Sequence, residues 1–234
     1  MTLPPYWEEP SEPLIRAPVV VLTAIGLLFL IHLVTALSSD AIRSDFVTQF
    51  ALIPVRFTAL AGQGFDLAAA ASTLLTLITY AFLHDDFMHV TVNCVSLLAT
   101  ATPVARRIGT RRFLAFAATA AVCAALAHVL THLGSSEPRM GASGVVFAMV
   151  GSFARFLFLD SKQPAEWPRG TQPLMTRSAL LWALIWTASI MVLGLAQETT
   201  GLLARYPDWE GHLGGFFAGF LLFPLFDRNR SWLR

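Results

Sequence analysis

The sequence predicts an all-α, polytopic membrane protein with six transmembrane helices and a large first external loop. Of its 234 residues, 55% are hydrophobic and only 13% are charged. Its mean hydropathy is +0.61, which lies outside the usual range of soluble globular domains. The apolar residues come in runs of about 20, the length that a helix needs to cross a hydrocarbon layer of roughly 30 Å.

The chain divides into a membrane domain, 17–227, between two short tails that we expect in the cytoplasm. Residues 1–16 are acidic and rich in proline, which disfavours a helix, and residues 228–234 are basic. Six spans are predicted in order, at 17–37, 87–105, 112–133, 142–160, 178–195 and 210–226.

The long segment 38–84 contains an apolar stretch, 66–83, that resembles a seventh span. Positive charges decide against it. With six spans, 12 of the 16 arginines and lysines lie on the cytoplasmic side and 4 outside, as the positive-inside rule requires. A seventh span would move the arginine-rich turn 106–112 to the outside. We therefore predict that 38–84 is an external loop that lies partly in the membrane interface.

Three short motifs place polar side chains at the outer ends of the second, fourth and sixth spans. A polar side chain in such a place is costly unless it is paired or functional. Because the topology was derived from charges alone, the convergence of the motifs on one face is independent support for a shared site. The motifs are His89-x-x-x-Asn93, Gly141-Ala-Ser143-Gly144 and Gly211-His212-x-x-Gly215-x-x-x-Gly219.

The serine and the second histidine have the chemistry of acyl transfer. Glycines around Ser143 at a helix start leave backbone N–H groups free to bind an oxyanion. Gly215 and Gly219 allow close helix packing, which would bring His212 to the serine as a general base. The alternatives are a small-residue packing patch at Ser143 and a packing helix whose histidine merely lies at the interface.

His89 and Asn93 are four residues apart and therefore share one helical face. Two donors on one face suit an oxyanion, and a structural polar pair is the alternative. A zinc half-site is disfavoured because asparagine is a poor zinc ligand and the sequence has no His-Glu-x-x-His set. We expect no metal and no cofactor.

Other polar residues near these motifs have simpler interpretations. Residues 84–86 are expected in a solvated turn before a helix. His128 and His132 are interpreted as interfacial histidines rather than ligands. Asp208 and Glu210 are left in a loop, because a carboxylate so close along the chain is badly placed to orient His212.

Together the three motifs resemble the rhomboid family of intramembrane serine proteases, over roughly residues 80–220. The resemblance implies that Ser143 is the nucleophile and His212 the base, with His89 and Asn93 assisting the oxyanion. It also implies supporting roles for five further residues: Gly141, Gly144, Phe147, Gly215 and Gly219.

Some positions depart from the family pattern. Phe147 stands where tyrosine is frequent, and Gly211 stands where alanine is usual before the histidine. The family's Trp-Arg pair is missing at Leu75–Thr76, and its frequent glutamate is Ala105. These changes bear on loop anchoring and stability rather than on the Ser-His pair.

The resemblance implies cleavage of membrane proteins in or near their transmembrane segments. The expected partners are transmembrane protein substrates and the lipid bilayer, and the absence of a basic arm argues against nucleic acid. The expected location is a bacterial inner membrane, with the site opening to the outer face, and the oligomeric state stays open. The alternative function is a non-catalytic rhomboid-like protein that binds transmembrane clients.

Overall fold

The computed structural model describes residues 17–62, 66–157, 171, 173–200 and 208–227, so both predicted tails lie outside the described residues. Within these ranges the chain is helical, and its extended pairing is limited to an isolated bridge between Leu52 and Arg139. In chain order the elements are α1 (Val19–Leu37), α2 (Asp40–Phe50), α3 (Val55–Gly62), α4 (Leu67–Thr79), η1 (Tyr80–Phe82), α5 (Phe87–Ile108), α6 (Thr110–Thr131), α7 (Ser143–Phe153), α8 (Arg177–Thr200) and α9 (Trp209–Phe226).

The structure confirms the all-α membrane class and locates a helix at each predicted span. Among the described residues, four helices are long and apolar enough to cross a membrane: α1, α5, α6 and α8. The count of six crossings stays a prediction. The predicted span 142–160 is too long, because α7 ends at Phe153 and residues 154–157 form a turn.

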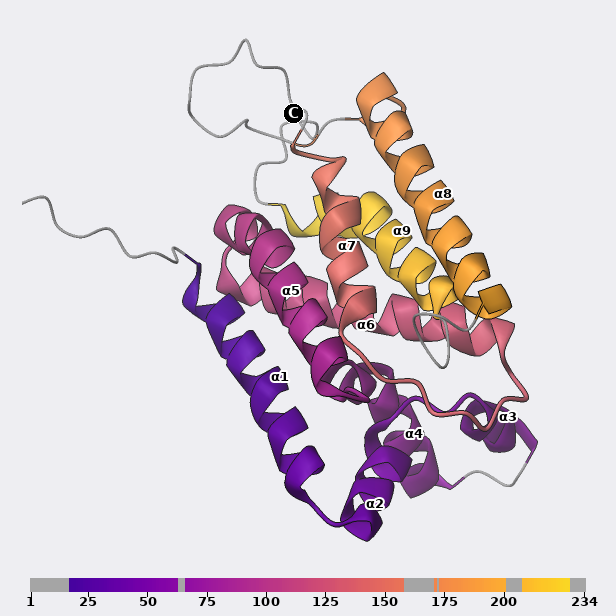
Figure 1. Cartoon of the computed structure of the whole chain (residues 1–234). Coiled ribbons are helices and arrows are strands. Elements are labelled where there is room, and N and C mark those ends of the chain that lie inside the picture. Colours follow the sequence, from indigo (N-terminus) through magenta and orange to yellow (C-terminus); the bar gives the residue numbers. More distant parts are fainter. Residues whose placement is uncertain (1–16, 63–65, 158–170, 172, 201–207, 228–234) are drawn as a thin grey trace, which may run out of the picture.

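Helix α7 is short because it lies inside the bundle rather than facing lipid along its whole length. Eleven residues make a helix about 16 Å long, roughly half of the hydrocarbon thickness. Figure 1 shows α7 in the middle of the molecule, and it packs against α9, α5 and α6. The chain just before Ser143 is irregular, but it is surrounded by protein. Its backbone N–H and C=O groups can therefore be paired although apolar helices lie beside it.

The segment predicted as a large external loop is folded into α2, α3, α4 and η1. These elements gather at one end of the bundle, where α1 ends and α5 begins (Figure 1). Helix α4 has 13 residues, about 20 Å, and is too short to cross by itself. Tyr80 anchors the segment to the bundle by donating a hydrogen bond to the Ala121 carbonyl at 3.0 Å. Its position in the membrane interface stays a prediction.

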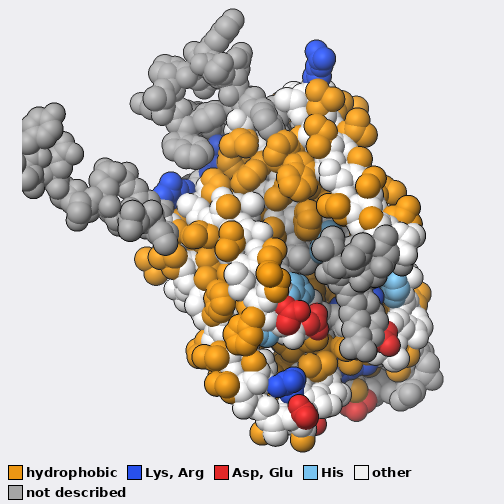
Figure 2. Space-filling view, viewed as in Figure 1, with side chains coloured by type: hydrophobic (Ala, Val, Ile, Leu, Met, Phe, Trp, Pro, Cys, Tyr) orange, Lys and Arg blue, Asp and Glu red, His pale blue; other side chains and the backbone are white. Residues whose placement is uncertain are grey.

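The outward faces of α1, α5 and α8 are apolar. Figure 2 shows hydrophobic side chains over the visible flank, with the acidic side chains gathered in its lower half. Exposed hydrophobic side chains of this kind suit contact with lipid and would be unfavourable in water. Examples are Leu30, Leu33, Val92, Val95, Leu184, Ile185 and Val192.

The closest helix contact joins α7 to α9, and it depends on small residues. A Cβ atom added to Gly215 would overlap the backbone of Gly144, and one added to Gly219 would overlap the Ala148 carbonyl. From the other side, a Cβ atom on Gly151 would overlap the backbone of Phe216. Small residues at four-residue spacing thus let the two backbones touch, which sets the distance between the starts of the two helices.

Two further contacts fix the ends of the bundle. At the end away from Ser143, the Arg107 guanidinium binds the Asp227 carboxylate, with N–O distances of 2.9 and 2.7 Å. Both side chains are buried, so this pair ties the end of α5 to the end of α9. At the opposite end, Leu52 and Arg139 exchange two backbone hydrogen bonds, which attach the α2–α3 connection to the chain before α7.

His84 joins the chain before α5 to the chain before α7. Its Nε2 accepts a hydrogen bond from the Ala142 N–H at 3.4 Å, and the side chain is buried rather than solvated as the sequence suggested. Burial lowers the pKa of His84 to about 3, and the nearby His89 and His32 lower it further, against an opposing effect of Asp85. The neutral ring is therefore the form that fits this place.

We predict that Gly219→Val destabilises the protein by about 1–3 kcal/mol or more, because the added side chain must separate α7 from α9. The matched control is Gly26→Ala in α1, where an added Cβ meets nothing within 4 Å. Thermal unfolding in detergent checks both variants. Equal melting temperatures for wild type and Gly219→Val would show that the two backbones are not in contact.

We predict that His84 makes the fold sensitive to acid. Its pKa is about 3 in the folded state and about 6.5 when unfolded, so the unfolded state binds more protons between these values. Stability from this group is complete above about pH 6.5 and falls as the pH drops towards 3, by at most about 1.4 kcal/mol per pH unit.

The His84→Gln variant isolates this effect, because the glutamine oxygen can accept the same N–H bond without titrating. The difference in unfolding free energy between wild type and variant should change with pH from 7 to 4.5, with the wild type losing more. If the unfolding free energies of wild type and variant change with pH in parallel, His84 is not buried in its neutral form.

Candidate active site

Ser143 is the first residue of α7 and follows a glycine that no other residue can replace without strain. Gly141 has φ +131°, and a Cβ atom there would lie 2.9 Å from the ring of His89. Its N–H donates to the Tyr80 carbonyl at 3.0 Å. The chain therefore makes a close turn against His89 and delivers Ser143 to the helix start.

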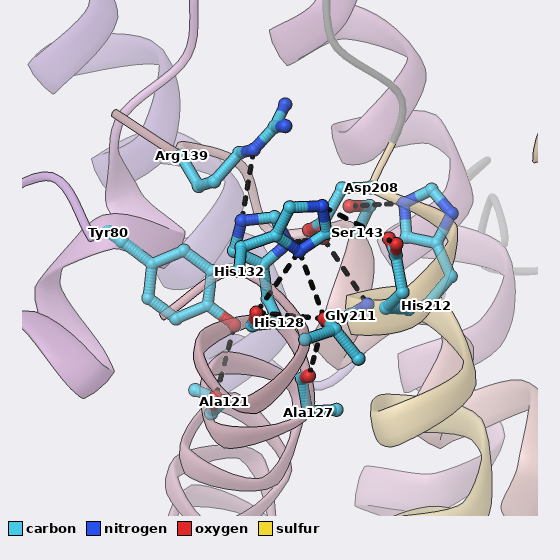
Figure 3. Close-up of polar contacts among 12 residues, drawn as sticks. Tyr80, Ala121, Ala127, His128, His132, Arg139, Ser143, Asp208, Gly211 and His212 are labelled. Atoms are coloured by element: carbon cyan, nitrogen blue, oxygen red, sulfur yellow. Dashed lines mark hydrogen bonds and ion pairs between the residues drawn. The ribbon is translucent and has the colours of Figure 1, made fainter. Parts of the chain in front are cut away.

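His212 lies in the first turn of α9 and reaches the serine directly. Its Nε2 is 2.9 Å from Ser143 Oγ, within hydrogen-bond distance (Figure 3). The imidazole packs on the Phe147 ring, with a centroid distance of 4.6 Å and an angle of 31°. The structure thus brings together the two residues that the sequence paired, although they are 69 positions apart. Packing on Phe147 restricts the orientation of the His212 ring.

The start of α7 is suited to bind a negative charge. Asp86 and Asp208 are the N-cap residues of α5 and α9, and their carboxylates accept hydrogen bonds from backbone N–H groups of the first turn. In α7 the preceding residue, Ala142, supplies no side-chain cap. The first N–H groups of a helix have no partner within it, and the helix dipole is positive there. This end of α7 can therefore stabilise an oxyanion beside Ser143 Oγ.

His89 lies against the turn before Ser143, and Asn93 lies one helical turn further along α5. The His89 ring rests against Gly141 and packs edge-on against His84, with a centroid distance of 4.9 Å. Asn93 is buried, and its amide donates to the His89 carbonyl at 3.1 Å. The primary amide keeps a second N–H. Their role as oxyanion donors stays a prediction.

A polar network that the three motifs do not predict lies behind the Ser-His pair. Asp208 Oδ1 accepts a hydrogen bond from the Gly211 N–H at 3.3 Å and lies 2.7 Å from His128 Nδ1. On the other side of that ring, Arg139 Nε donates to His128 Nε2 at 3.1 Å (Figure 3). Burial acts to raise the pKa of Asp208, but the contact with His128 and the nearby His212 and Arg139 together lower it.

Two interpretations from the sequence are therefore wrong. His128 is buried, at 1% exposure, rather than interfacial. Asp208 and Glu210 were both expected in a loop, but Asp208 is the N-cap of α9 and Glu210 lies in its first turn. The aspartate four residues before His212 is a typical helix-start signal, and it could have identified the cap. The pairing with His128 joins elements 80 residues apart and has no local signal.

Two tryptophans on α8 also contact the site region, although no sequence motif marks them. Trp182 Nε1 donates to the Val150 carbonyl at 2.9 Å, which attaches α8 to α7. Trp186 packs edge-on against Phe147, with a centroid distance of 6.2 Å. Phe147 in turn packs on the imidazole of His212. A shift of α8 would therefore reach His212 through Trp186 and Phe147.

Comparison with known proteins agrees with this arrangement. The sequence matches the Rhomboid domain family over residues 71–228. It is 26% identical over 158 residues to Rhomboid protein 1, mitochondrial, of Saccharomyces cerevisiae, covering 63% of this chain and 40% of that protein. It is 25% identical over 146 residues to RHOMBOID-like protein 5 of Arabidopsis thaliana, covering 62% and 42%.

The chain thus aligns with about two fifths of the length of these relatives. The matched region contains the serine, the three glycines of the α7–α9 contact, and all four polar residues of the predicted site. The helices that it includes are those that form the bundle around α7. More than half of the chain is matched, and we conclude that the protein belongs to the rhomboid family.

Proposed function

We propose that this protein is an intramembrane serine protease that hydrolyses peptide bonds with Ser143 and His212. The observation that carries the proposal is the 2.9 Å contact between Ser143 Oγ and His212 Nε2. A serine is a weak nucleophile until an adjacent base takes its proton. The contact places the imidazole nitrogen of His212 where it can take the proton of Ser143. The comparisons show the family and not the activity of this chain, so the proposal rests on the geometry.

In the proposed reaction His212 Nε2 takes the Ser143 proton as Oγ attacks a peptide carbonyl. The carbonyl oxygen becomes negative and is stabilised by N–H groups at the start of α7, with His89 and Asn93 as further donors. His212 then returns the proton to the leaving amine. Water, activated by the same imidazole, hydrolyses the acyl-enzyme and releases the second product.

The proposed substrates are membrane proteins cut in or near a transmembrane segment. An apolar recess between α8 and the first residue of α9 supports this. It is lined by Met191, Val192, Leu195 and Trp209. Apolar side chains of a membrane segment would match such a lining. Three of the lining side chains, on α8, are also exposed and apolar, so the proposed approach of a substrate is from within the bilayer.

The proposed topology follows from charge. The basic residues of the turn 106–112 lie in the cytoplasm under the positive-inside rule, which puts Ser143 near the outer face. The expectation of a bacterial inner membrane gains no support from the relatives, one of which is named as mitochondrial and the other of which is a plant protein.

We predict that a fluorophosphonate probe labels the detergent-purified protein, and that Ser143→Ala and His212→Ala both abolish labelling. The probe reacts with a serine only when a base activates it, and it requires no knowledge of the substrate. Ser152→Ala, in the same helix, is the control that should keep labelling. A folded wild type that stays unlabelled would favour the alternative function, a non-catalytic protein that binds transmembrane clients.

We predict that Asn93→Ala lowers the rate of probe labelling by up to about 10²–10³-fold, the usual effect of losing one oxyanion donor. Asn93→Asp is a useful companion, because it keeps the shape and removes the amide donor. If both variants react at the wild-type rate, Asn93 serves the structure of α5 and not the reaction.

A further inference from the structure

A second cluster of ionisable side chains lies behind the Ser-His pair, where the end of α6 meets the start of α9. Its members include His128, the adjacent His132 and Asp208 (Figure 3). Glu210, in the first turn of α9, completes the cluster beside His132. The proposed reaction does not require all of these groups. Two histidines and two carboxylates gathered at one helix junction therefore need an explanation of their own.

The two histidines lie one turn apart at the end of α6, and their rings are side by side. The rings are stacked, with centroids 4.4 Å apart and an angle of 11° between their planes. Glu210 Oε1 lies 3.6 Å from His132 Nε2. One ligand-type atom from each of His128, His132 and Glu210 lies within 4.8 Å of the other two.

One polar atom in this cluster, Glu210 Oε2, is buried without a hydrogen-bond partner among the described residues. Glu210 is 9% exposed. A buried carboxylate oxygen in this state is costly, and a bound cation would satisfy it. His128 Nδ1 lies 2.7 Å from Asp208 Oδ1, so a cation on this nitrogen would also lie beside a second carboxylate.

We propose that His128, His132 and Glu210 bind one divalent transition-metal ion, with zinc as the best match to the donors. Imidazole nitrogen and carboxylate oxygen are common zinc ligands, at about 2.0–2.2 Å. Two such ligands around a tetrahedral ion lie about 3.3 Å apart, close to the 3.6 Å between His132 and Glu210. Asp208 lies beside His128 and offers a fourth oxygen.

Arg139 competes with the metal for His128. Its Nε donates to His128 Nε2, so the proton of the neutral imidazole is on Nδ1 in this arrangement. A metal on Nδ1 shifts that proton to Nε2, where two donors would then face each other. Arg139 must turn away for the ion to bind. Replacing Arg139 by glutamine supplies an acceptor for the Nε2 proton instead, as metal-bound histidines usually require.

Metal binding at this place would join α6 to α9. Both carboxylates precede His212 by only a few residues, so the ion would hold the start of the helix that carries the proposed base. Since the ion binds the folded protein, it should raise the melting temperature. The site itself depends on the cluster alone and not on the proposed protease activity.

The test is zinc titration by calorimetry on the purified full-length protein without a histidine tag, after treatment with a chelator. Cobalt absorption spectra report whether the ion is tetrahedral. The variants are His132→Asn and Glu210→Gln, which remove a ligand, and Arg139→Gln, which removes the competitor. Glu137→Gln is the matched control, because Glu137 is an exposed carboxylate in the neighbouring loop. Melting temperatures verify that each variant folds.

We expect one zinc ion per chain. Binding should weaken by more than about tenfold in His132→Asn and in Glu210→Gln, since a direct ligand contributes at least as much as an outer partner. It should tighten in Arg139→Gln and stay unchanged in Glu137→Gln. No stoichiometric binding to the folded wild type, or equal binding by wild type, His132→Asn and Glu210→Gln, would overturn the proposal.

Discussion

The direct contact between the backbones of α7 and α9 is the constraint on which the rest of the structure depends. It is made at three glycines, and a single methyl group at any of them would collide with main-chain atoms of the facing helix. In a bilayer, apolar side chains gain little by leaving lipid for protein, so association relies on close packing. The same contact sets how near the start of one helix comes to the start of the other. The 2.9 Å distance between Ser143 and His212 is a consequence of it.

The polar groups around this contact are held by elements that come from far along the chain. The turn before Ser143 is positioned by Tyr80, His84 and the backbone pairing with Leu52. The segment 38–84 therefore does more than connect two spans, because it builds one wall of the site. Its short helices lie against the irregular chain before α7 and satisfy backbone groups that would otherwise be unpaired near lipid. This explains why α7 can begin so deep in the molecule.

The start of α9 serves two clusters at once. His212 faces Ser143 on one side, while Asp208 and Glu210 face the histidines of α6 on the other. A movement of the start of α9 would therefore change both clusters. Asp208 takes part in both, because it caps the turn that carries His212 and also contacts His128. The pairing of Asp208 with His128 and Arg139 places compensating charge behind the imidazole without a carboxylate bound directly to it in the contacts described. A Ser-His pair without a third member is consistent with that arrangement.

The membrane class, the approximate helices and the identity of the paired serine and histidine could be predicted from the sequence. These follow from local signals: apolar runs, the glycines beside Ser143 and the spacing of Gly215 and Gly219. Only the tertiary structure decided the short length of α7, the helical fold of 38–84, and the burial of His84 and His128. The physical reason is the same for all of these. Whether a polar side chain is solvated or buried depends on partners that are distant in sequence, and hydropathy along the chain does not report them.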